Sequence, residues 1–298
     1  MNNMLAVIII NYKNEQQTIN YIEQEIKKIT VPHKVVIVNN EATKQSNEIL
    51  SNALNARIIY DTDTQNFYKT DHYIISCKEN LGFAKGNNLG AQFALKEFSP
   101  NFILFTNNDI IIEGTNVVAK LLEKIQNNNN IGIIGPKVIG IDGRLQSPEP
   151  FFSFWDNYIW VYLGTFFYST RKKRERFKMD YAEKAQEGFH YKLMGSFFIV
   201  KSDDFFACGM MDPNTFLYNE EAILSERMKK INKYAYYYPQ VAVIHEHGNT
   251  IKKYNTRKRM RDLKFASASY YYKTYVGTSN FTIFLGKIIK YILNILHK

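Results

Sequence analysis

Cysteine is almost absent from this chain of 298 residues, which contains only Cys77 and Cys208. Two cysteines build neither a disulfide framework nor a cysteine-rich zinc site, so we interpret both as core residues of a reducing compartment. The amino terminus lacks basic residues before its apolar run, and that run, residues 4–10, is too short for a signal peptide core. We therefore expect a buried first strand and a cytoplasmic location.

Net charge is missing from most of the chain. The formal charge of +10 belongs to residues 251–298, which hold 11 Lys/Arg and one acid, Asp262. The other 250 residues hold 27 basic and 27 acidic side chains. A nucleic-acid enzyme would more often carry its basic residues over its main groove, so we expect no nucleic-acid partner. A basic tail instead favours an anionic membrane surface, approached through residues 252–298.

Apolar runs and amphipathic segments alternate through the first 140 residues. The strands that we expect are residues 5–12, 33–40, 73–79, 102–112 and 131–139. The helices that we expect are residues 14–29, 41–54, 89–98 and 117–130. This alternation predicts an α/β fold with a parallel, doubly wound sheet and a ligand at the carboxyl ends of the strands. Residues 141–190 are aromatic and irregular with a charge run at 171–178, which suggests an acceptor-facing segment.

Polar residues gather where three of these strands end, and the first such group is Asn39 and Asn40. The segment NLGFAKGNN (residues 80–88) packs two glycines and three asparagines between a strand and a helix. Such a loop suits either a phosphate-bearing nucleotide or an ordinary turn. The segment TNND (residues 106–109) ends an apolar strand, and its carboxylate suits a divalent cation held beside a diphosphate. A strand that simply ends in a turn is the alternative.

Two later motifs carry groups suited to catalysis. Glu220 and Glu221 open a predicted helix, where a carboxylate in a cleft could act as a general base for an alcohol. The alternative is that both acids only complement the helix dipole. His245 and His247 flank Glu246 directly after an apolar strand, so both imidazoles could face one metal or be ordinary exposed histidines.

In this order, the motifs resemble the family 2 glycosyltransferases with a GT-A fold, in the rhamnosyltransferase-like branch that builds bacterial surface polysaccharides. The resemblance rests on N-x-G-F-A-x-G-N-N followed by N-N-D and covers roughly residues 4–250. It implies a Rossmann-like, mostly parallel sheet flanked by helices. Residues 1–140 would then form a nucleotide-binding half, residues 141–250 an acceptor half, and residues 251–298 a basic amphipathic helical tail.

The resemblance also assigns roles in binding a nucleotide-diphosphate sugar. The residues matching donor contacts are Asn11, Tyr12, Asn39, Asn80, Gly82, Lys85, Gly86, Asn107 and Asn108. Asn39 stands where the family usually has an Asp that holds the nucleobase or ribose, which leaves UDP-, dTDP- and GDP-linked donors open. Asn80, Gly82, Lys85 and Gly86 match the loop over the nucleotide, where the glycines would let the backbone approach the donor.

The metal ligands implied by the resemblance are Asp109, in an N-x-D form of the D-x-D motif, and His245, the histidine of an H-x-x-G-x-S/T motif that ends here at Thr250. Mg²⁺ or Mn²⁺ would be the cofactor. Gly195 and Ser196 match the small-residue turn where acceptor and donor sugar meet.

Glu221 replaces the family's catalytic Asp, with Glu220 before it, and Ile223 replaces a following Asp. The implied function is inverting transfer of a sugar to a hydroxyl of a glycan, which we expect to be lipid-linked. Because three positions depart from the family pattern, a catalytically inactive nucleotide-sugar-binding partner of a glycosyltransferase complex is the alternative. A nucleotidyltransferase would need glycine directly after the first strand, and NYKNEQQ has none.

The last segment, residues 281–298, has Lys287, Lys290, Asn294 and Lys298 on one helical stripe, with apolar residues around the rest. This pattern fits an interfacial helix better than a spanning one. We expect peripheral attachment at the inner face of the plasma membrane. A helix that packs on the body, or on a second subunit of a homo-oligomer, is the alternative.

Overall fold

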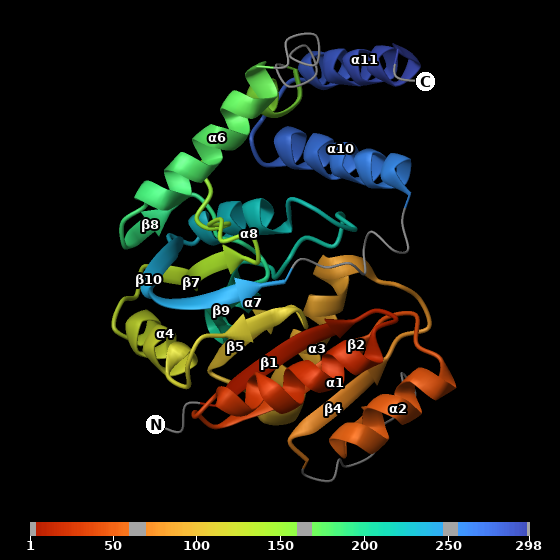
Figure 1. Cartoon of the computed structure of the whole chain (residues 1–298), viewed down its shortest axis with the longest axis vertical. Coiled ribbons are helices and arrows are strands. Elements are labelled where there is room, and N and C mark those ends of the chain that lie inside the picture. Colours follow the sequence, from red (N-terminus) through yellow and green to blue (C-terminus); the bar gives the residue numbers. More distant parts are fainter. Residues whose placement is uncertain (1–3, 60–69, 160–168, 247–255, 297–298) are drawn as a thin grey trace.

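The computed structural model describes residues 4–59, 70–159, 169–246 and 256–296, and these build one ten-stranded sheet with helices on both faces (Figure 1). The strands are β1 (Leu5–Asn11), β2 (His33–Asn39), β3 (Arg57–Ile59), β4 (His72–Ser76), β5 (Phe102–Thr106), β6 (Ile110–Ile112), β7 (Ile131–Gly140), β8 (Gly188–His190), β9 (Phe197–Lys201) and β10 (Tyr234–His245). The helices are α1 (Glu15–Gln24), α2 (Lys44–Leu54), α3 (Gly82–Phe98), α4 (Val117–Gln126), α6 (Ser169–Lys184), α7 (Ser202–Ala207), α8 (Glu220–Lys229), α10 (Arg257–Thr274) and α11 (Asn280–Leu296). Two short turns of helix, η1 (Ile26–Lys28) and η2 (Trp155–Ile159), complete the described elements.

The strand order is β3-β4-β2-β1-β5-β9-β7-β10-β6, and β8 pairs with β10. Strands β3, β4, β2, β1 and β5 run parallel, as do β7 and β10, whereas β9, β6 and β8 are antiparallel to their neighbours. This arrangement confirms the predicted α/β class with a mostly parallel sheet. The parallel half gathers the ends of β1, β2, β4 and β5 at one edge.

Alternating side chains of β1 pack into apolar clusters on the two faces of the sheet. Val7 and Ile9 of β1 share an apolar cluster with α1, α2 and α4. Ala6 and Ile8 point the other way and pack in a cluster with α3, α7 and α8. This alternation explains why the first strand is apolar throughout, because both of its faces are covered.

The segment at residues 102–112 is not one strand. It forms β5, then turns at Asn108 and Asp109, and continues as β6, which pairs with β10 elsewhere in the sheet. The polar residues therefore end a strand, as expected, but the apolar residues after them belong to a different part of the sheet. A short strand, β3, lies at the sheet edge where we predicted none.

The segment at residues 80–88 is mostly helical, because α3 already begins at Gly82. Gly82 has φ +73°, and a Cβ there would lie 2.4 Å from the carbonyl oxygen of Phe216. A Cβ on Gly86 would lie 3.1 Å from the side chain of Ile10. Both glycines are therefore explained by close packing within the protein. The expectation of a loop conformation is wrong for Gly82, Lys85 and Gly86, which lie in the helix.

Residues 171–178, the charge run, are also helical and not irregular, since they lie within α6. Part of the expected aromatic acceptor segment, residues 160–168, lies outside the described residues.

The basic tail is not an appendage, because its first helix is part of the body. Phe265, Ala268, Tyr271 and Tyr272 of α10 form an apolar cluster with Phe154, Ala222 and Ile223, which we call the α10 cluster. Figure 1 shows α10 stacked next to α8, with α11 outermost at one end of the molecule. Within the described ranges, no helix is both long and apolar enough to cross a membrane.

Candidate functional site

Neighbouring strands bring the NND motif beside the predicted acceptor turn. Strands β5 and β9 pair antiparallel, with Thr106 opposite Phe197. The backbone N–H of Asn107 continues this ladder by donating a hydrogen bond to the carbonyl oxygen of Ser196 at 2.9 Å. Two motifs that are almost ninety residues apart in the sequence thus lie in contact at the end of the sheet.

The catalytic carboxylate that we predicted, Glu221, lies on the bare backbone of Gly195. A Cβ at Gly195 would lie 2.4 Å from Oε1 of Glu221 and 2.7 Å from its Cγ. Only glycine therefore permits this position of the carboxylate. Directly before α8, Tyr218 and Asn219 adopt left-handed φ values of +77° and +67°. Two consecutive strained residues at this point set the direction of the first turn that carries Glu221.

The two adjacent glutamates occupy different environments. Glu220 is only 5% exposed, whereas Glu221 is half-buried. Burial, and then the negative charge of Glu221, raise the pKa of Glu220 to about 8. At neutral pH Glu220 therefore holds a proton, and Glu221 is the carboxylate that solvent or a substrate can reach. Different environments for paired carboxyl groups commonly separate their roles in catalysis.

A half-buried charge cluster that the sequence did not predict lies beside this carboxylate. Glu149 accepts from Nζ of Lys178 at 2.7 Å and pairs with Nζ of Lys192 at 3.2 Å. Burial alone would raise the pKa of Glu149, but the two ammonium groups lower it to about 2. Burial lowers the pKa of Lys192, yet the charges of Glu149 and Glu221 raise it overall. Lys192 therefore brings positive charge to the region of Glu221. No motif in the sequence predicted this role for Lys192.

Asp109 and His245, the predicted metal ligands, lie together at the end of β10. His245 Nε2 is 3.4 Å from Asp109 Oδ1, and the two residues are 4% and 7% exposed. On the other side of the ring, Nδ1 lies 2.8 Å from Oε1 of Gln146. Because an amide oxygen only accepts hydrogen bonds, Nδ1 carries a proton, and in the neutral ring Nε2 presents its lone pair toward Asp109.

A buried carboxylate oxygen next to an imidazole nitrogen fits a divalent cation. Within the described residues, Asp109 Oδ1 accepts no hydrogen bond. Mn²⁺ takes carboxylate and imidazole ligands, whereas Mg²⁺ prefers oxygen alone. No group of three or more His, Cys, Asp or Glu suited to a metal occurs in the described parts of the chain, so a cation here would need further ligands from substrate or water. His247 and Thr250 of the same motif lie outside the described residues.

The predicted nucleotide contacts at Asn11 and Asn39 are buried and already hydrogen-bonded. Asn11 Nδ2 donates to Asn39 Oδ1 at 2.8 Å, and Asn39 Nδ2 donates to Ser46 and Asn47 at 3.0 and 2.8 Å. Thr18 donates to Asn11 Oδ1 at 2.8 Å. Both asparagines are at most 1% exposed. Their side chains therefore join the ends of β1 and β2, and a nucleotide contact through either would require this network to open.

The partly exposed groups at these strand ends are neighbours of Asn11 and Asn39. Tyr12 donates from its hydroxyl to Glu41 Oε2 at 3.1 Å, and Lys13 pairs with Glu41 Oε1 at 2.6 Å. Glu41 has φ +53° and directs an accessible carboxylate over the end of β2. Apart from its place after Asn39 and Asn40, nothing in the sequence pointed to Glu41.

The remaining predicted donor residues fall into two groups. Asn80 Oδ1 accepts a hydrogen bond from the backbone N–H of Gly82 at 2.9 Å, and Asn108 Nδ2 donates a hydrogen bond to the hydroxyl of Thr18 at 2.8 Å. Both side chains therefore already have partners within the protein. Lys85 is exposed in the first turns of α3. Contact of any of them with a donor stays a prediction.

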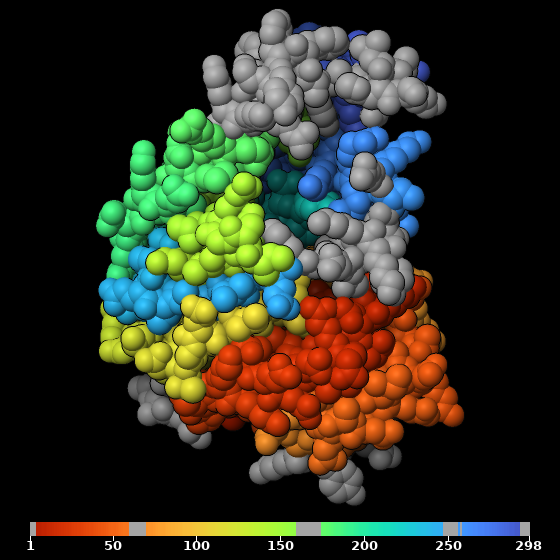
Figure 2. All heavy atoms as spheres, in the orientation of Figure 1, coloured from red at the N-terminus to blue at the C-terminus, as the bar shows by residue number. Residues whose placement is uncertain are grey.

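The surface above α8 is hollowed. Figure 2 shows a depression between the blue helix α10 and the green segments, with the teal region that includes α8 at its floor. Because Glu221 lies in the first turn of α8, the floor of this hollow belongs to the same element as the carboxylate.

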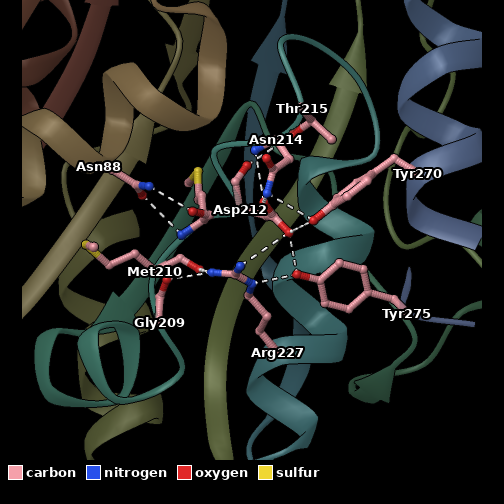
Figure 3. Close-up of polar contacts among 10 residues, drawn as sticks. Asn88, Gly209, Met210, Asp212, Asn214, Thr215, Arg227, Tyr270 and Tyr275 are labelled. Carbon is pink, nitrogen blue, oxygen red and sulfur yellow. Dashed lines mark hydrogen bonds and ion pairs between the residues drawn. The ribbon is translucent and has the colours of Figure 1, made fainter. Parts of the chain in front are cut away.

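A buried polar cluster holds α10 in place next to α8. Asp212 is 2% exposed and accepts from the hydroxyls of Tyr270 and Tyr275 at 2.7 and 2.5 Å. Arg227 of α8 pairs with Asp212 at 3.2 Å and donates to Tyr275 at 2.9 Å. Figure 3 shows these groups converging, with Asn88 of α3 bonded to the backbone beside them. We did not predict this cluster from the sequence.

Comparison with known proteins gives one family and several similar chains. The sequence profile described as Glycosyl transferase family 2 matches residues 6–199. A curated relative, the low-salt glycan biosynthesis hexosyltransferase Agl10 of Haloferax volcanii, is 23% identical over 230 residues, which are 76% of this chain. The match spans 62% of that relative's length.

Two solved structures share the fold. TarS 1-349 of S. aureus superposes with a TM-score of 0.53 at 12% identity, over 91% of this chain and 72% of that one. The mannosyltransferase PcManGT of Pyrobaculum calidifontis, in complex with GDP-Man and Mn²⁺, gives a TM-score of 0.52 at 10% identity, over 96% of this chain and 73% of that one. At these identities the likeness concerns the fold alone.

Proposed function

Because the chain belongs to glycosyl transferase family 2, we propose that it is an inverting hexosyltransferase, which moves a sugar from a nucleotide-diphosphate sugar to a hydroxyl group of a glycan. The observation that carries this proposal is the position of Glu221, a reachable carboxylate on the bare backbone of Gly195. The adjoining Ser196 contacts the NND motif. The proposed base, the small-residue turn and the backbone of the NND motif are thus linked by direct contacts.

The proposed reaction is a single in-line displacement. The acceptor hydroxyl oxygen forms a bond to the anomeric carbon, while the bond from that carbon to the diphosphate oxygen breaks. The bonding electrons leave with the nucleoside diphosphate, and Glu221 takes the hydroxyl proton. Because attack and departure occur on opposite sides of the carbon, the configuration inverts. Burial favours the protonated form of Glu220 beside the base.

Asp109 and His245 are the residues that would hold Mg²⁺ or Mn²⁺. When bound, such an ion neutralises the negative charge of the departing diphosphate. Gln146 orients the His245 ring through its contact with Nδ1, which keeps the other ring nitrogen directed at Asp109.

A nucleotide-linked donor is supported by the family and by solved relatives of this fold. One is described with GDP-Man and Mn²⁺, and another, GalNAc-T7, with UDP, GalNAc and Mn²⁺. We propose a UDP-, dTDP- or GDP-linked hexose as donor. For the acceptor we propose a glycan, since the curated relative is named for glycan biosynthesis. That the glycan is lipid-linked and belongs to bacterial polysaccharide biosynthesis is proposed from the motif resemblance.

A catalytically inactive nucleotide-sugar-binding partner is the second candidate. Glu221 in place of Asp and the closed amide network of Asn39 favour it. The third departure, Ile223, has a structural explanation, since it is fully buried in the α10 cluster, where an Asp would be desolvated. Ile223 therefore does not argue against activity.

The experiment is a panel of UDP-, dTDP- and GDP-sugars with purified protein and Mn²⁺, in which product release and anomeric configuration are followed by NMR. We expect one donor to be turned over with inversion, and Glu221→Gln to lower kcat by at least about 10²-fold. The matched control is Glu123→Gln, the same chemical change at an exposed position of α4. Donor binding without turnover, unaffected by Glu221→Gln, would favour the inactive partner. Retained configuration would contradict the displacement.

A further inference from the structure

Helix α11 leaves a row of large apolar side chains in solvent. Phe281, Phe284, Ile288, Tyr291 and Ile292 are 73, 58, 38, 67 and 47% exposed. They recur at spacings of three and four residues, which places them on one face of the helix. We call this row the α11 stripe. Large contiguous apolar surfaces on soluble proteins usually mark a contact with a membrane or another protein.

The other face of α11 is packed, so the direction of the stripe is determined by the fold. Ile283 and Ile289 pack against the α10 cluster, and Gly286 is buried. Lys290 turns inward to pair with Asp262 of α10 at 2.7 Å. Figure 1 shows α11 as the outermost element at its end of the molecule. Because one face is anchored on α10, the stripe faces away from the body.

Positive charge is concentrated on α11 and on α10, the helix against which it packs. From residue 256 to residue 296 the chain has eight Lys/Arg and one acid, Asp262, which is already paired with Lys290. Lys258, Arg259 and Arg261 of α10 and Lys287 of α11 are exposed. A second copy of this face would bring cations against cations, whereas anionic lipid headgroups complement them.

We infer that α11 lies in the interface of an anionic lipid bilayer, with the α11 stripe among the acyl chains and the cations of α10 and α11 on the headgroups. Such a helix lies along the membrane, which agrees with its amphipathic pattern and the central Lys287 and Lys290. The protein would then bind the cytoplasmic face of the membrane, where anionic headgroups are exposed. This agrees with the expected peripheral attachment at the inner face of the plasma membrane.

The fold connects this membrane contact to the candidate site. Tyr270 and Tyr275, at the end of α10, are hydrogen-bonded to Asp212, and Tyr275 also to Arg227 (Figure 3). Ile223 of α8 packs against α10 in the α10 cluster. Because α10 connects α11 to α8, a bilayer bound through α11 would be held near the helix that carries Glu221. The delivery of a lipid-linked acceptor from this bilayer to Glu221 rests on the proposed function. Membrane binding itself does not depend on it.

The test is flotation of the full chain with vesicles of phosphatidylcholine alone and of phosphatidylcholine mixed with phosphatidylglycerol. We expect flotation only with the anionic vesicles, weakened by added salt. Phe284→Ser with Ile288→Ser should reduce the bound fraction by at least about tenfold. The control is Ile49→Ser with Leu95→Ser, which removes two exposed apolar side chains from α2 and α3. Circular dichroism verifies that both double variants fold.

Equal flotation of the two double variants, or no flotation of the wild type, would overturn the inference. A wild-type dimer in light scattering that Phe284→Ser with Ile288→Ser converts to a monomer, without vesicle binding, would overturn it in favour of a second copy. Glu221→Gln should float like the wild type. Loss of turnover with retained flotation would separate a failure of the proposed chemistry from a failure of membrane binding.

Discussion

The contact between Gly195 and Glu221 predicts the effect of one added methyl group. In Gly195→Ala, the new Cβ would lie 2.4 Å from Glu221 Oε1, whereas ordinary contacts begin at 3.4 Å. The carboxylate must therefore retreat by about 1 Å. A misplacement of this size at a catalytic group can lower the rate by about 10²-fold, equivalent to about 2.7 kcal/mol in the activation barrier.

The assay is steady-state turnover of the donor identified in the nucleotide-sugar panel, with KM determined separately. We expect kcat to fall and the KM of the donor to change little, because the added methyl group displaces the base. The control is Gly188→Ala in β8, where a Cβ would meet nothing within 4 Å. Its left-handed φ of +150° still imposes backbone strain, so it reports the effect of alanine without the clash. Wild-type kcat in a folded Gly195→Ala variant would refute the assignment of Glu221 as base.

Three further predictions concern the buried groups around the site. The pKa of Glu220 is raised to about 8, so the folded state keeps a proton that the unfolded state loses near pH 4.5, and wild-type stability falls as the pH rises from about 4.5 to about 8. In calorimetric scans above pH 8, the Tm of Glu220→Gln should exceed that of the wild type by about 2 °C or more. Below pH 4.5 this difference should disappear. Asp212→Asn breaks a buried ion pair with Arg227 and should lower the free energy of unfolding by about 3 kcal/mol, measured by urea denaturation. A loss under about 1 kcal/mol would contradict the role of Asp212 in holding α10 next to α8. Gln146→Leu removes the partner of His245 Nδ1 and should weaken Mn²⁺ binding by about tenfold in titration calorimetry with a nucleoside diphosphate present; unchanged affinity would exclude His245 as a ligand.

The sequence was informative where a local pattern has a direct structural cause. Continuous apolar runs predicted β1, β2 and β7, because strands buried on both faces need no polar side chains. Adjacent acids predicted the start of α8 at Glu220. Asp109 and His245 were matched from motifs 136 residues apart, and they do lie within 3.4 Å of each other. The role of that pair in holding a metal stays a prediction.

The sequence was less informative where residues have partners inside the protein. Asn39 was predicted to contact the nucleotide, and the structure shows its amide hydrogen-bonded to Asn11, Ser46 and Asn47, so the contact stays a prediction. Gly86 looked like a loop residue, yet it packs a helix on Ile10. A short motif does not reveal which neighbours will occupy its hydrogen-bonding groups or the space beside its Cα, because those neighbours come from other elements.

By itself, the amino-acid sequence determined the α/β class, the family and the amphipathic character of the last helix, because apolar spacing and short motifs are local properties of the chain. Only the tertiary structure decided which of the paired glutamates is reachable, that Gly195 must stay bare beneath Glu221, and that α10 packs into the body. The direction of the α11 stripe is decided in the same way. Burial and contact depend on which distant elements meet, and that information exists only once the chain has folded.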